Sequence, residues 1–63
     1  MNVHVLIIGN DLNVQKLISD IIEITYSKVT IFREMNVEGL YKKLEDKEYS
    51  YNIIVRCLHY IFN

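Results

Sequence analysis

The fold of this 63-residue chain is decided by its opening stretch, Val3-His4-Val5-Leu6-Ile7-Ile8-Gly9-Asn10-Asp11. Its continuous apolar run predicts a strand over residues 3–8 that is covered on both faces, as central parallel strands are. The polar turn that follows leads directly into a helical pattern, which is how an α/β unit begins. Ligands of such folds bind in the crevice beyond the carboxyl end of the strand. The first question is therefore whether Gly9, Asn10 and Asp11 can carry chemistry.

Residues 12–25 predict an amphipathic helix. Its apolar residues are spaced by three and four positions, so we expect them to form the buried stripe. They are Leu12, Val14, Leu17, Ile18, Ile21 and Ile22. The polar residues between them fall on the remaining surface: Asn13, Gln15, Lys16, Ser19, Asp20 and Glu23. Asp11 or Asn10 is expected to cap the first turn by accepting hydrogen bonds from free backbone amides.

The rest of the chain repeats the alternation of strand and helix. Lys28 to Arg33 is rich in β-branched residues and predicts a strand, whose charged ends suit a sheet edge. Asn36 is expected to cap a second helix, whose apolar face is formed by Val37, Leu40, Tyr41 and Leu44. Tyr51 to Cys57 predicts a third strand. The tail, residues 58–63, either extends this strand or packs elsewhere. This βαβαβ order implies one α/β domain over residues 1–63 with a parallel sheet.

Composition and charge narrow the possible partners. The chain is 51% hydrophobic, which is high for a domain that buries only about 60% of its unfolded surface. We therefore expect part of the apolar surface to face another chain, most simply in a homodimer. Seven basic and eight acidic residues leave a net charge of −1, and Lys42-Lys43 is the only basic pair. Nucleic-acid binding normally requires clustered Lys and Arg, so we expect none.

The single cysteine and the hydropathy of the sequence indicate the cellular compartment in which the protein is expected. Cys57 is the only cysteine, so the chain cannot form an internal disulfide, which fits a reducing compartment. The amino terminus lacks the basic region, apolar core and small-residue cleavage site of a signal peptide. No apolar run approaches the ~20 residues that span a bilayer. The sequence therefore predicts a cytoplasmic protein that does not bind membranes.

Four stretches of the sequence resemble a response-regulator receiver domain, the flavodoxin-like module of two-component signalling. They are Leu6-Ile7-Ile8 in the first strand, Leu17, Ile18, Ile21 and Ile22 in the first helix, Glu38-Gly39-Leu40 in the second helix and Tyr51-Asn52-Ile53-Ile54-Val55 in the third strand. The resemblance runs from Val3 to about Leu58 and covers the first half of a receiver. It implies a three-layer half-flavodoxin with strand order 2-1-3 and the two helices on opposite faces of the sheet.

The residues that carry phosphotransfer in that family are missing at the matching positions. The resemblance implies an acidic pair that holds Mg²⁺ and an aspartate that accepts the phosphoryl group, but Gly9, Asn10 and Cys57 stand there. Neither Gly9 nor Asn10 supplies the anionic oxygen that Mg²⁺ prefers, and a thiol cannot form an aspartyl phosphate. Asp11 lies one position late and is interpreted as the helix cap. We expect a degenerate phosphorylation pocket at Gly9, Asn10, Asp11 and Cys57, without catalysis, metal or cofactor.

Cys57 has further interpretations. It is either a small core residue or a reactive thiol, for which His59 is the better cationic neighbour because Arg56 points to the opposite face of the sheet. A metal site formed by Cys57, His59 and His4 is disfavoured. His4 begins the first strand and Cys57 ends the third, so a parallel sheet separates them by more than about 10 Å.

Arg56 interrupts the apolar third strand, as expected if that strand lies at an open or partly open edge. An open edge beside an apolar tail invites pairing with another chain. The predicted oligomer interface consists of Arg56, Leu58, Tyr60, Ile61 and Phe62. The alternative is a tail that folds back over the sheet and completes the core of a monomer.

The sequence therefore predicts a non-catalytic pseudo-receiver that acts by binding. By resemblance, receivers meet histidine kinases and phosphotransferases through the first helix and the neighbouring loops. The matching surface here consists of Asp11, Leu12, Asn13, Val14, Gln15 and Lys16. Such a protein modulates a phosphorelay by occupying a partner without exchanging phosphoryl groups. Three alternatives stay open: a homo-oligomeric assembly protein, a small thiol enzyme that uses Cys57, and a remnant of a larger gene without a selected activity.

Overall fold

The computed structural model describes residues 2–46 and 50–57, which form five elements. In chain order they are β1 (Val3–Ile8), α1 (Leu12–Thr25), β2 (Val29–Glu34), α2 (Val37–Glu45) and β3 (Ile53–Arg56). The predicted order is confirmed, with β2 shifted by one residue and β3 shorter than expected. The tail residues assigned to an oligomer interface lie outside the described residues.

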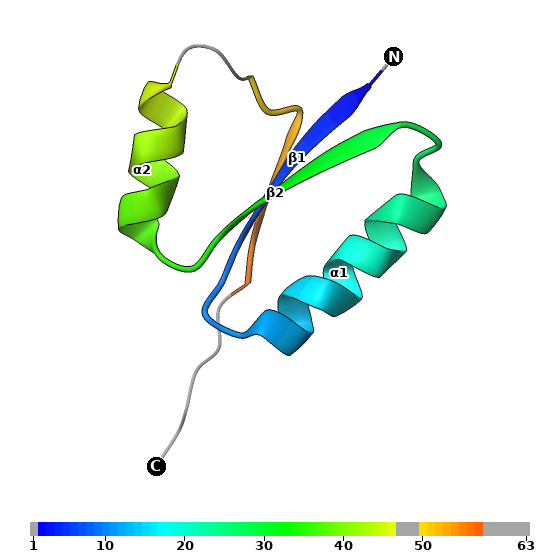
Figure 1. Cartoon of the computed structure of the whole chain (residues 1–63), viewed down its shortest axis with the longest axis horizontal. Coiled ribbons are helices and arrows are strands. Elements are labelled where there is room, and N and C mark those ends of the chain that lie inside the picture. Colours follow the sequence, from blue (N-terminus) through cyan, green and yellow to red (C-terminus); the bar gives the residue numbers. More distant parts are fainter. Residues whose placement is uncertain (1, 47–49, 58–63) are drawn as a thin grey trace.

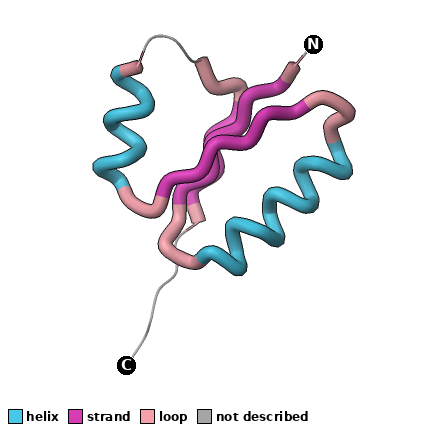
Figure 2. Tube along the Cα trace, in the orientation of Figure 1, coloured by secondary structure: helices cyan, strands magenta, loops and turns pink. Residues whose placement is uncertain are grey.

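The three strands form one parallel sheet in the order β2-β1-β3. Val5 of β1 pairs with Ile31 on one side and with Ile53 on the other. Figures 1 and 2 show the sheet nearly edge-on, with α1 on one face and α2 on the other. The predicted strand order and the helices on both faces are therefore confirmed.

The central strand forms the core. Four consecutive residues of β1, Val5–Ile8, are buried. On the α1 face, Val5 and Ile7 pack with Ile22 of α1, and half-buried apolar side chains of β2 and β3 surround them. The continuous apolar run thus has the burial on both faces that the sequence predicts. Among the described residues, no helix is long and apolar enough to cross a bilayer.

The face that α1 turns toward the sheet is only partly the predicted one: Ile22 is in the core and Ile18 packs against it, as expected. The buried residues of α1 are Gln15, Ser19 and Ile22. Leu12, Leu17 and Ile21, which the periodicity assigned to the buried stripe, are instead exposed. The prediction that Gln15 and Ser19 lie on the solvent-facing surface is therefore wrong, and the helix is rotated about its axis relative to its hydrophobic pattern.

Hydrogen bonds of Gln15 explain this rotation. Its Nε2 donates to the carbonyl oxygen of Gly9 at 2.7 Å and to that of Glu34 at 3.0 Å. These carbonyls lie just beyond the end of β1 and at the end of β2, where buried acceptors need a donor. Ser19 Oγ donates to the Gln15 carbonyl at 2.8 Å and accepts from Arg33 of β2 at 3.0 Å. Polar contacts therefore orient α1 on the sheet.

The second helix, α2, covers the opposite face more lightly. Asn36 caps it as predicted, since its side chain accepts from the Gly39 amide at 2.9 Å. None of its residues is buried, and Tyr41, predicted to lie on the apolar face, is exposed. Lys43 is half-buried: it pairs with Glu34 at 3.3 Å and lies over the ring of Phe32. Contacts to β2 rather than a deep apolar stripe hold α2 in place.

Replacing Gln15 by Met tests how α1 is oriented. Met keeps the length of the side chain but removes the donor to the Gly9 carbonyl, so we expect a loss of about 1–2 kcal/mol in the free energy of unfolding by urea. Asn13→Met, at an exposed position in the same turn, is the control and is expected to change stability by less than about 0.5 kcal/mol. Equal effects of the two substitutions would contradict this role of Gln15.

Candidate functional site

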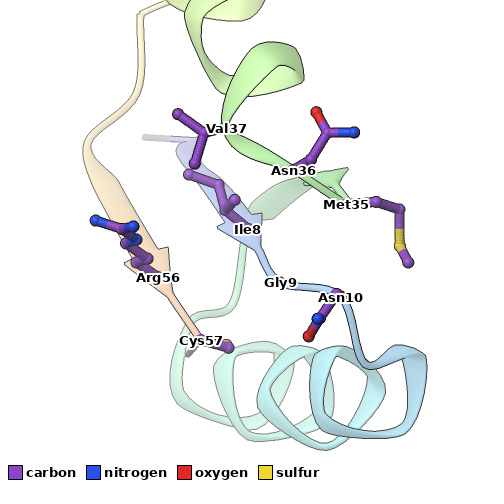
Figure 3. A pocket seen from close by; sticks show the side chains of 8 residues that line it. All are labelled: Ile8, Gly9, Asn10, Met35, Asn36, Val37, Arg56 and Cys57. Atoms are coloured by element: carbon purple, nitrogen blue, oxygen red, sulfur yellow. The ribbon is translucent and has the colours of Figure 1, made fainter. Parts of the chain in front are cut away.

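A cleft lies at the carboxyl end of the sheet, where the crevice was expected. Its volume is about 210 Å³. Figure 3 shows its lining, which comes from the ends of β1 and β3 and from the start of α2. The lining residues are Ile8, Gly9, Asn10, Met35, Asn36, Val37, Arg56 and Cys57. The structure thus brings together three of the four residues assigned to the degenerate pocket, and Asp11 lies outside the lining.

Close approach between Gly9 and Cys57 shapes the floor of the cleft. The Cys57 amide donates to the Ile8 carbonyl at 2.7 Å, which continues the pairing of β1 with β3. A Cβ atom on Gly9 would lie 2.9 Å from the Cys57 Cβ and 3.1 Å from its carbonyl oxygen. Gly9 does not have a positive φ, so a turn conformation does not require glycine here. Glycine is required because there is no room for a side chain beside Cys57.

Asp11 caps α1, as predicted. Its carboxylate accepts from the backbone amide of Asn13 at 2.9 Å and from that of Val14 at 3.3 Å. Both are amides of the first turn that lack a partner within the helix. The acid that follows the cleft residues Gly9 and Asn10 is therefore engaged in holding the start of the helix.

The polar groups around the cleft are amides and one guanidinium. Asn10 is exposed, and Asn36 is the cap of α2. Arg56 and Cys57 are neighbours in sequence but point in different directions, as alternation along a strand requires (Figure 3). No carboxylate stands among the residues that line the cleft. The cleft can therefore offer hydrogen bonds and one positive charge, but not the anionic oxygens that Mg²⁺ prefers.

His4 and Cys57, two residues of the disfavoured metal site, lie at opposite ends of the sheet. His4 lies at the amino end of β1, where its Nδ1 is 3.2 Å from the Ser50 carbonyl oxygen, whereas Cys57 follows the opposite end of β3. Across residues 2–46 and 50–57, the structure contains no group of three or more His, Cys, Asp and Glu that could hold a metal ion. His59, expected as the neighbour of the thiol, lies outside the described residues.

The surface assigned to a protein partner is only partly available. Leu12, Asn13 and Lys16 are exposed on the first turns of α1, while Asp11 and Val14 are half-buried. Gln15 is 1% exposed and contributes nothing to an outer surface, so its assignment to the partner-binding set is wrong. The hydrophobic pattern could not show this, because the backbone acceptors that bury Gln15 come from two other elements.

The predicted oligomer interface is represented in the structure by Arg56 alone. Arg56 is exposed on the edge strand β3, beside the exposed side chain of Ile54. Leu58, Tyr60, Ile61 and Phe62 lie outside the described residues.

Sequence reasoning missed a different apolar surface, which Leu17, Ile21 and Ile24 form on the outside of α1. The unusually wide apolar arc of this helix was the signal for it.

Comparisons of the chain with protein-family models, with curated proteins and with solved structures find no match.

Gly9→Ala tests the close approach at the floor of the cleft. The added methyl group must displace the backbone of Cys57, so we expect a loss of about 1–3 kcal/mol in the free energy of unfolding. Asn10→Ala, on the exposed rim of the same cleft, is expected to change stability by less than about 0.5 kcal/mol. If Gly9→Ala were as stable as the wild type, the contact with Cys57 would not be the reason for glycine.

Two substitutions of Asp11 test its role as a cap. Asp11→Ala removes the acceptor and should lower stability by about 1 kcal/mol, whereas Asp11→Asn keeps an oxygen in the same place and should lose much less. Thermal unfolding followed by circular dichroism measures both. An Asn variant as unstable as the Ala variant would show that the charge, not the hydrogen bond, matters.

Proposed function

We propose that this chain is a non-catalytic, receiver-like binding module that occupies a histidine kinase or phosphotransferase without exchanging phosphoryl groups. The observation that carries the proposal is the composition of the cleft. It lies where an α/β fold of this order binds its ligand. Gly9, Asn10 and Cys57 surround it in place of carboxylates, and Asp11 is engaged as a cap. A site with this lining favours binding over phosphotransfer.

The start of α1 is the surface through which we propose that the module binds. Leu12, Asn13 and Lys16 are exposed there and follow directly on the cleft residues Gly9 and Asn10. Gln15 hydrogen-bonds beneath them to the ends of β1 and β2, so this surface is held on a rigid support. The apolar side chain of Leu12, flanked by the Asn13 amide and the Lys16 ammonium group, suits a helical partner whose binding surface has an acidic rim.

The proposal places the protein in the cytoplasm. Its support is the lone Cys57, which fits a reducing compartment.

Binding to purified kinase and histidine-phosphotransfer domains tests the proposal. We expect saturable binding by calorimetry, weakened by about tenfold or more when Leu12→Glu and Asn13→Glu are combined, because the new charges meet the acidic rim. Lys42→Glu on the exposed side of α2 is the control and should leave affinity unchanged. The absence of binding, or binding that the double variant does not affect, would overturn the proposal.

Phosphotransfer is measured in the same system. When the partner carries a labelled phosphoryl group, we expect no label on the chain with or without Mg²⁺. Transfer of label to the chain would contradict a purely binding role.

A further inference from the structure

An apolar stripe on the outer side of α1 has no partner within the described part of the chain. Leu17, Ile21 and Ile24 are 61%, 56% and 86% exposed. Spacings of four and three residues place them on one side of the helix. That side is opposite to the buried residues Gln15, Ser19 and Ile22, which face the sheet. Large exposed apolar side chains that adjoin one another mark an interaction surface.

The described elements cannot cover this stripe. The other helix, α2, packs on the far face of the sheet, and the strands contact the inner side of α1 (Figure 1). Among residues 2–46 and 50–57, the buried apolar side chains are those of Val5, Leu6, Ile7, Ile8 and Ile22. A domain of this size gains a large share of its stability when a further apolar surface, such as this stripe, is also removed from water.

The charges that flank the stripe indicate which occupant fits. Lys16 stands near the start of α1 and Glu23 near its end, seven positions apart and thus on the same flank. In an antiparallel pair of identical helices, Lys16 of one copy lies near Glu23 of the other. In a parallel pair this flank would face the opposite flank of the partner helix, which carries the uncharged residues Val14, Ile18 and Thr25, so Lys16 and Glu23 would not meet. Asp20, near the middle, already pairs with Lys16 of its own helix at 3.3 Å.

We infer that a second copy of this chain packs its α1 antiparallel to the first through Leu17, Ile21 and Ile24. The stripe is close to symmetric about Ile21, so the same three residues serve both copies, as a two-fold interface requires. The contact between two 14-residue helices is short, so we expect an interface at the small end of the range for specific complexes and weak association. This inference does not depend on the proposed function.

Sedimentation velocity on the full chain, from about 1 μM to about 1 mM, tests the inference over the range expected of a small interface. The wild type is expected to pass from monomer to dimer. Leu17→Lys and Ile24→Lys should each remain monomeric while keeping the circular dichroism of the wild type, because both side chains point away from the sheet. Leu44→Lys on α2 is the matched control, since Leu44 is 49% exposed, and should still dimerise.

Charge reversal tests the antiparallel arrangement. Lys16→Glu and Glu23→Lys alone should each weaken the dimer by about tenfold, and a mixture of the two variants should form a heterodimer, because each then offers the charge that the other lacks. A wild type that stays monomeric throughout, a dimer insensitive to Leu17→Lys, or a mixture that associates no better than its components overturns the inference.

Discussion

Removal of the central strand from water is the constraint on which the rest of this structure depends. Val5, Leu6, Ile7 and Ile8 are buried, with β2 and β3 paired along the two edges of β1 and a helix on each face. Both faces of β1 need a cover, so the two crossovers must run on opposite sides of the sheet. The cleft follows from the same arrangement, because the chain leaves β1 and β3 at the same end.

Much of this arrangement could be predicted from the sequence, because the signals are local. The apolar run of β1, the alternation in β2 and the two capping residues each identify an element from its own residues. The rotation of α1 could not be predicted in this way. It depends on the Gly9 carbonyl, which lies beyond the end of β1 and accepts from Gln15, and on a second hydrogen bond from Gln15 to the Glu34 carbonyl, which also accepts from the Gly9 amide. Periodicity ranks side chains by hydropathy and does not count backbone acceptors supplied by other elements.

The candidate site shows the same division between local and distant causes. The role of Asp11 follows from its place before a helix, and sequence reasoning identified it. Gly9 was interpreted as a turn residue, although its backbone is unremarkable and the approach of Cys57, 48 positions later, is what excludes a side chain. The exposed stripe on α1 was hidden for a related reason: two of its residues, Leu17 and Ile21, were assigned to the buried face of the helix, where Gln15 and Ser19 lie instead.

The order of the strands along the chain gives the central position of β1 a consequence for folding. Only one helix separates β1 from its neighbour β2, so these two strands meet by closing a short loop. The other neighbour, β3, comes last: the Asn52 side chain that bonds the His4 amide lies 48 residues away. Until β3 arrives, the most apolar strand of the chain has an unpaired edge, and such an edge is a template for aggregation. Any partly folded state in which β1 pairs with β2 but not with β3 therefore exposes this edge to neighbouring chains.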